Sequence, residues 1–156
     1  MVGDGYIVAA GHEDKSHNHS LRMLAFARAM LQAAVAVGAR HGLEVQIAIG
    51  IHKGEVYGGV VGIRCPRYHF FGPTLSVSNA IERACKPGKI LLSAPALAAI
   101  PTEKLEAAGL TFERNSDNPV VDCPGDTYVV CLTGQIHDVR AASGARGNDG
   151  GVMHVF

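Results

Sequence analysis

Three histidines near the start of the chain could do chemistry, because imidazole is a common metal ligand. His17 and His19 are two residues apart, and His12 lies in the same polar run. A zinc site needs three or four ligands, and neither a cysteine nor a carboxylate triad completes one here. We therefore interpret these histidines as part of a solvated loop.

The cysteines show neither a metal-binding nor a disulfide pattern. No Cys-x-x-Cys pair occurs, which argues against a thiolate zinc site. Four cysteines in a chain of 156 residues are more typical of reduced, partly buried thiols than of a disulfide framework. The pattern predicts a reducing intracellular compartment. The thiols belong to Cys65, Cys85, Cys123 and Cys131.

Asp4 and the glycines at 58, 59 and 62 are further candidates. Asp4 lies between two glycines, and by itself an Asp-Gly pair is typical of a hairpin turn. The glycines form no phosphate loop, because no Gly-Lys-Ser/Thr follows them. Gly58 and Gly59 instead predict that something approaches the backbone closely.

Composition limits the kind of partner. Fourteen basic residues balance fourteen acidic ones, so no positive field favours nucleic acid or an anionic membrane. We expect a small-molecule or protein partner and no nucleic acid. The first residues lack the features of a secretion signal, and we expect no apolar stretch long and uninterrupted enough to span a bilayer.

The elements that must position these residues follow from hydrophobic periodicity. Apolar residues at helical spacing predict a long helix over 20–40, ended by Gly42. Alternation over 45–52 predicts a strand with one buried face, paired with a strand at 56–61. Shorter signals predict strands at 6–10, 68–71, 90–92, 110–113 and 127–132, and helices at 73–85, 95–99 and 103–108, the last capped by Thr102. The sum is an α/β sandwich with a mostly antiparallel sheet and helices packed on it.

Four motifs, in order along the chain, carry a resemblance to class III nucleotidyl cyclases. IGIHKG at 49–54, followed by GGVVG at 58–62, resembles the "IGIHTG…AGVVG" strand pair of that family. CPRYHFFG at 65–72 is similar to the "MPRYCLFGD" segment typical of guanylate cyclases. GDGY at 3–6 resembles the "GDAY" hairpin, and GDTY at 125–128 resembles the closing strand. The resemblance implies the ferredoxin-like nucleotidyl cyclase fold.

The resemblance runs from residue 2 to about 133 and begins in the middle of the family's domain. The family's first strand, its two following helices and its second strand have no counterpart. We therefore expect an incomplete, C-terminal part of a guanylate-type cyclase domain at 1–133 and a flexible tail at 134–156. A missing first strand would leave an unpaired sheet edge that favours pairing with another chain.

The resemblance also implies a reaction and a metal. These enzymes cyclise a nucleoside triphosphate by attack of the ribose 3′ oxygen on the α-phosphate, with two metal ions clamping the reacting groups. Mg or Mn would be held by two aspartates. Asp4 matches the second of these, and the first belongs to the strand that has no counterpart.

The resemblance also implies two residues that would recognise the base of the nucleotide. Arg67 falls on the arginine associated with guanine recognition, and His69 stands where guanylate cyclases have a cysteine. His69 could donate or accept a hydrogen bond at a purine edge, or it could be a structural strand residue. Because the decisive glutamate position would precede Met1, GTP is expected but ATP stays open.

Other catalytic positions differ from the family pattern. Ser76 stands at the asparagine that orients the ribose, and Ala80 at the arginine that stabilises phosphate charge. Asp122 lies where the family has a triphosphate-binding lysine. Loss of one preorganised charge-stabilising group costs ~2.7–4 kcal/mol of barrier. Asn79 precedes Ala80 and points about a quarter-turn away, so we do not expect it to substitute.

Three hypotheses follow. The chain is a cyclase domain fragment that makes cyclic GMP in intracellular signalling when missing residues or a partner complete it, as a homo- or heterodimer with another cyclase domain. Alternatively, it is a pseudo-cyclase, a dimerising regulatory module without catalysis. A third possibility is an α/β interaction domain related only by ancestry. Whether the chain is an enzyme stays open. We expect a cytoplasmic location, or the cytosolic side of a membrane as part of a larger protein.

Overall fold

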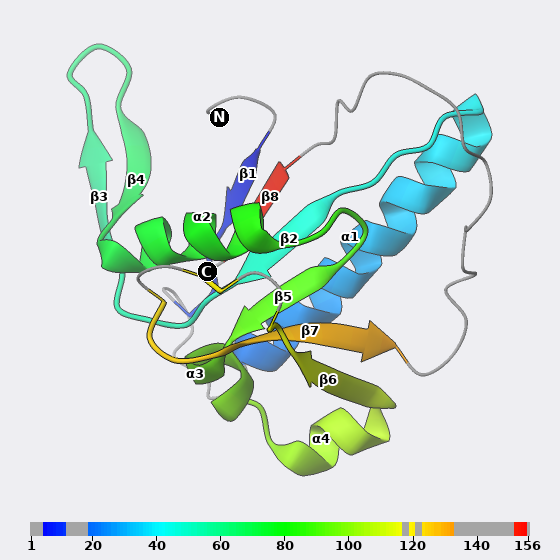
Figure 1. Cartoon of the computed structure of the whole chain (residues 1–156). Helices are drawn as coiled ribbons and strands as arrows, with labels where there is room; N and C mark the ends of the chain where they lie inside the picture. The colour runs from blue at the N-terminus through cyan, green and yellow to red at the C-terminus, as the bar shows by residue number, and fades with distance from the viewer. Residues whose placement is uncertain (1–4, 12–18, 117–118, 121–122, 133–151, 156) are drawn as a thin grey trace.

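A computed structural model describes residues 5–11, 19–116, 119–120, 123–132 and 152–155. Apart from β8, its helices and strands lie close to the predicted positions (Figure 1). The helices are α1 His19–His41, α2 Pro73–Ala84, α3 Ala94–Ala98 and α4 Thr102–Ala107. The strands are β1 Tyr6–Val8, β2 Ala48–Ile51, β3 Tyr57–Val61, β4 Arg67–Phe71, β5 Ile90–Ser93, β6 Leu110–Arg114, β7 Thr127–Leu132 and β8 Val152–Val155.

Helix α1 forms because apolar residues recur on one side of it, and this side packs on the sheet. Met23, Leu24, Ala27 and Leu31 are buried in one core with strand residues. The helix ends at Gly42, whose φ of 64° is readily adopted only by glycine. The amide of Leu43 donates to the carbonyl of Gly38 over 2.9 Å, which closes the end as a Schellman motif.

Helix α1 corrects one expectation from the sequence. By length and composition alone it could cross a membrane, whereas we expected no such stretch. A core helix of a globular domain passes the same test, and the buried side of α1 lies against the sheet.

The described strands form a six-stranded sheet in the order β1-β8-β2-β5-β7-β6, with a separate hairpin of β3 and β4. The pairs β1–β8, β8–β2 and β2–β5 are parallel, while β5–β7 and β7–β6 are antiparallel. The sheet is therefore mixed, and the expectation of a mostly antiparallel sheet does not describe it. Parallel pairing of β2 and β5 is possible because β3, β4 and α2 form a long crossover between them.

Two layers of helix cover the sheet. Ile49, Ile51, Ile90 and Leu92 belong to the same buried cluster as the apolar side of α1. Residues that alternate with them face the other side, where α2 lies (Figure 1). A Cβ added to Gly50 would lie 2.5 Å from the backbone nitrogen of Glu82, so α2 rests directly on the backbone of β2. Glycine at position 50 therefore sets the distance between helix and sheet.

Strand β8 comes from the segment that we expected to be a flexible tail. Val152–Val155 pairs with β1 on one side and β2 on the other. The tail expectation therefore does not hold for these four residues, and residues 133–151 lie outside the described part. We expected an unpaired sheet edge, whereas β8 pairs along the edge of β2. The domain division at residue 133 itself stays a prediction.

The remaining elements agree with the sequence apart from one cap. Gly109, with a φ of 60°, follows the end of α4. Thr102 is not the N-cap of α4: Pro101 occupies that position without a side-chain hydrogen bond, and Thr102 is the first helical residue. Pro101 has a ψ of 130°, so its backbone is extended and the helix begins at the next residue.

Candidate functional site

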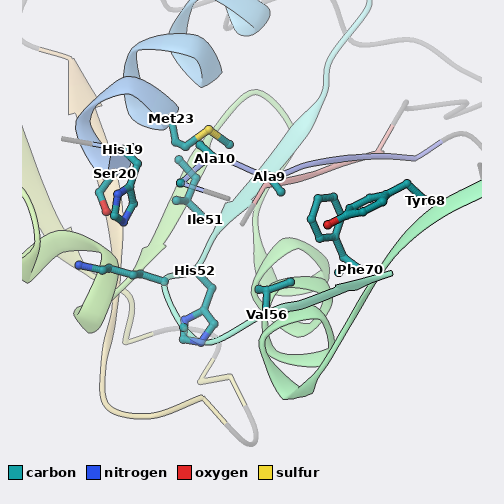
Figure 2. Close-up of a pocket in the computed structure, with 14 residues that line it drawn as sticks. Ala9, Ala10, His19, Ser20, Met23, Ile51, His52, Val56, Tyr68 and Phe70 are labelled. Atoms are coloured by element: carbon teal, nitrogen blue, oxygen red, sulfur yellow. The ribbon is translucent and has the colours of Figure 1, made fainter. Parts of the chain in front are cut away.

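A cavity of about 270 Å³ lies where the hairpin meets the sheet (Figure 2). The end of β1, the first turn of α1, the residues after β2 and the hairpin each supply part of its wall. Figure 2 shows His52 and the aromatic side chains of the hairpin around the same space. The lining residues are Ala9, Ala10, Gly11, His19, Ser20, Met23, Ile51, His52, Lys53, Gly54, Val56, Gly58, Tyr68 and Phe70.

His52 and Ser20 are the buried polar side chains of this cavity. The side chain of His52 is only 5% exposed, and its Nδ1 lies 2.8 Å from the hydroxyl oxygen of Ser93. That oxygen also accepts the amide of Ala96 over 3.3 Å at the start of α3. The serine proton is therefore available to Nδ1, which favours the tautomer with a proton on Nε2. Burial lowers the pKa of His52 below its usual value, so the neutral ring is favoured.

The hairpin contributes an aromatic pair. The rings of Tyr68 and Phe70 pack edge to face, with centroids 5.3 Å apart and planes at 81°. A Cβ on Gly58 would collide with the Tyr68 hydroxyl, because the tyrosine side chain lies over the glycine backbone. The expected close approach at Gly58 is thus confirmed, and its cause is the cross-strand tyrosine.

The two predicted nucleotide-binding residues lie on the other face of the hairpin. Arg67 and His69 alternate along β4 with Tyr68 and Phe70, so they do not line the cavity. Both are exposed, and the His69 ring lies 6.2 Å from that of Phe71 on the same face. A role for Arg67 and His69 with nucleotide stays a prediction.

Helix α2 carries the predicted catalytic position. Ser76 is exposed on this helix and Ala80 is half-buried. Thr74 fixes the start of α2 by donating to the carbonyl of Glu55 over 2.5 Å. The side-chain oxygen of Asn79 is buried and has no hydrogen-bond partner in the described part of the chain. This orientation agrees with the expectation that Asn79 does not substitute at position 80.

No metal site can be assembled from the residues that the structure describes. These residues contain no group of three or more histidine, cysteine, aspartate or glutamate side chains placed to hold an ion. Asp4, the predicted metal ligand, and Asp122 lie outside the described part, as do His12 and His17. His19 begins α1 and lines the cavity rather than belonging to an open loop.

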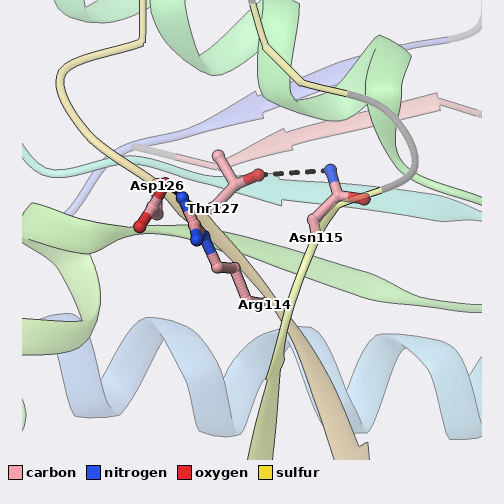
Figure 3. Close-up of polar contacts among 4 residues, drawn as sticks. All are labelled: Arg114, Asn115, Asp126 and Thr127. Carbon is pink, nitrogen blue, oxygen red and sulfur yellow. Dashed lines mark hydrogen bonds and ion pairs between the residues drawn. The ribbon is translucent and has the colours of Figure 1, made fainter.

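A polar cluster joins the end of β6 to the start of β7 (Figure 3). The guanidinium of Arg114 lies 2.7 Å from a carboxylate oxygen of Asp126, which raises the pKa of Arg114. Asn115 donates its side-chain amide to the hydroxyl of Thr127 over 3.2 Å. Both groups of the ion pair are exposed, so its contribution to stability is small.

Sequence comparison decides which family these elements belong to. The adenylate and guanylate cyclase catalytic domain matches residues 1–117. The chain belongs to this family. The cyclase domain is also 33% identical over 132 residues to guanylate cyclase soluble subunit alpha-2 of Homo sapiens. That alignment covers 81% of this chain but 18% of the relative, so the chain spans less than a fifth of that protein.

Two solved cyclase structures share the fold. The guanylate cyclase domain of RhGC from Catenaria anguillulae, in complex with GTP, matches at 20% identity with a TM-score of 0.64, covering 78% of this chain and 64% of that chain. A non-canonical dimeric guanylyl cyclase domain of the RhoGC fusion protein from Blastocladiella emersonii matches at 20% identity with a TM-score of 0.60, covering 77% of this chain and 62% of that chain. The predicted family and the α/β nucleotidyl cyclase fold are confirmed.

Sequence reasoning missed the residues that form the cavity of this cyclase domain. His52 follows a strand with period-two alternation, which placed it on the uncovered face. Its burial arises because α2 and α3 cover that end of β2, and the pairing with Ser93 joins positions 41 residues apart. One signal in the sequence was usable for Tyr68, since Gly58 already indicated that something approaches its backbone closely.

Proposed function

We propose that this chain is one protomer of a guanylate-type cyclase whose catalytic site is completed by a second cyclase domain. It would take part in the synthesis of cyclic GMP from GTP in intracellular signalling, and would be weak or inactive alone. The observation that carries the proposal is the match to the cyclase family over 1–117 together with an exposed serine, Ser76, at the asparagine position of α2.

The chain's own contribution would come from three positions. Arg67 and His69, exposed on one face of β4, are accessible to a nucleotide held against the hairpin. Asp4 immediately precedes Gly5 and β1, and would hold Mg or Mn together with ligands from elsewhere. Such a metal, when bound, would stabilise charge on the reacting phosphate oxygens.

Several catalytic side chains of the family are replaced in this chain, which favours a composite catalytic site shared with a second cyclase domain. Ser76 and Ala80 supply neither an amide for the ribose nor a positive charge for the phosphates, and Asp122 replaces a lysine. A partner would therefore have to supply these groups. The human relative is named as a subunit, and one of the related structures is described as a non-canonical dimer. Both fit a protomer that shares its site.

A pseudo-cyclase is the second candidate, and the same positions favour it. Three losses of charge or hydrogen-bonding capacity in one site would reduce the rate far below that of an intact cyclase, since each costs ~100- to 1000-fold. A dimerising module could keep the fold without the reaction. Both candidates place the domain in the cytoplasm, or on the cytosolic side of a membrane within a larger protein.

A cyclase assay separates the two candidates. Purified chain is incubated with Mn²⁺ and GTP, or ATP, with and without an intact cyclase domain. We expect cyclic GMP above the partner's own rate only in the mixture, and we expect this gain to disappear with Asp4→Ala but not with the control Glu103→Ala on α4. Ser76→Asn combined with Ala80→Arg should not produce activity in the chain alone.

Two results would contradict the composite site. Cyclic nucleotide formed by the double variant without a partner would mean that one chain holds the whole site. No gain in any mixture, together with no nucleotide-dependent change in Tm, would identify a pseudo-cyclase.

A further inference from the structure

The sheet contains a slot that is one strand wide. β1 and β2 run in the same direction, do not pair with each other, and both pair with β8. On one side, β8 pairs through Met153 to Val155 with Tyr6 to Val8 of β1. On the other side, it pairs through Val152 to Val155 with Ala48 to Ile51 of β2. Without β8, two strand edges would face each other across roughly 9–10 Å, twice the spacing of neighbouring strands.

The two walls of this slot differ in how firmly they are held. β2 also pairs with β5 and carries α2 against Gly50, so it keeps its place without β8. In the described part of the chain, β1 has β8 as its sole strand partner. Tyr6 and Ile7 are 62% and 48% exposed, so packing holds β1 weakly. The position of β1 therefore depends on the occupant of the slot.

We propose that this slot is a strand-binding site, and that the strand Val152–Val155 of a second copy of the chain can take the place of the chain's own β8. An extended peptide that adds to exposed strand edges gains main-chain hydrogen bonds on both sides. The occupant has the same sequence in either case, so exchange preserves every sheet contact, which makes strand swapping a low-cost route to a dimer.

The length of chain between β7 and β8 allows both arrangements. Nineteen residues, 133–151, separate the two strands in sequence. When extended, they reach about 60 Å, which is more than the ~30–40 Å width of a domain of this size. The tethered strand therefore competes with an untethered one at an effective concentration in the millimolar range.

The test uses the full chain and a synthetic peptide of residues 150–156 as the second strand. His154→Pro removes a ladder donor from the middle of β8 and prevents the chain's own strand from docking. We expect this variant to bind the labelled peptide at least ~10-fold more tightly than the unaltered chain. The matched control His154→Val keeps the backbone donor and should behave like the unaltered chain.

Equal binding to all three chains, or no binding to His154→Pro, would overturn the proposal. A second measurement needs no variant and covers the case in which His154→Pro does not fold. In hydrogen exchange of the unaltered chain, the amides of β1 should exchange together with those of β8 and before those of β5 and β7. Protection of β1 that outlasts that of β8 would equally overturn it.

Discussion

At the scale of single residues, strand alternation separates two sets of side chains on the hairpin. Arg67 and His69 face one side of β4, and Tyr68 and Phe70 face the cavity on the other. A nucleotide that contacts the first pair therefore does not occupy the cavity formed by the second. If Arg67 and His69 contact guanine as predicted, the residues of this cavity, above all His52, are structural or recognise a group other than that base.

His52 makes the stability of the domain depend on pH. Its pKa is lowered by burial, so below about pH 6.5 the unfolded chain binds a proton that the folded chain resists. The free energy of unfolding should therefore fall as the pH drops through this range. We expect His52→Gln to lose part of this dependence, measured by urea unfolding at pH 7.5 and 5.5.

The control for this experiment is His69→Gln, because that ring is exposed in the folded chain. It should keep the pH dependence of the unaltered protein. If His52→Gln and His69→Gln show parallel profiles, desolvation of His52 does not contribute to acid sensitivity.

At the scale of elements, the contact between α2 and β2 depends on Gly50. An added Cβ would lie 2.5 Å from the nitrogen and 2.8 Å from the Cα of Glu82, and both are backbone atoms that cannot rotate away. We expect Gly50→Ala to destabilise the domain by ~1–3 kcal/mol through overpacking. Urea unfolding measures this loss.

Gly59→Ala offers a matched control in β3. The nearest atom to its added Cβ is a Phe71 ring carbon at 3.9 Å, so the methyl group fits without displacement. This variant should be as stable as the unaltered chain or slightly more stable. A similar loss in both variants would show that the cost comes from the strand conformation and not from the contact with α2.

The elements differ in how far the sequence predicts them. α1 and its end at Gly42 follow from helical spacing and a stop residue, and both signals are local. β8 could not be predicted in this way, because four residues after a glycine-rich run carry no period and its pairing depends on a distant slot. The burial of His52 could not be predicted for a related reason. Alternation indicates that one face of the strand is covered, but Gly50 lets α2 cover the second face as well.

At the scale of the whole molecule, the β3–β4 hairpin extends away from the sheet and its helices (Figure 1). It exposes large apolar side chains at both ends and at its tip, including Tyr57 at 66%, Val60 at 68% and a fully exposed Ile63. Exposed apolar side chains on both faces of one protruding hairpin are the reason that we expect an interaction surface here. In keeping with the proposed function, we expect a second cyclase domain as the partner at this surface.

We therefore expect the chain to self-associate through the hairpin, and Val60→Ser with Ile63→Ser to weaken this association. A stable interface needs about 800 Å² from each partner, and removal of its apolar centre should raise the dissociation constant at least ~10-fold. Light scattering coupled to size-exclusion chromatography over a range of concentrations measures the dissociation constant.

Val35→Ser, at a 60% exposed position on the outer side of α1, is the control. A monodisperse monomer at every concentration, or equal loss with Val35→Ser, would contradict the role of the hairpin. Since these substitutions leave β1, β2 and β8 unaltered, hydrogen exchange of those strands distinguishes association through the hairpin from exchange of the C-terminal strand.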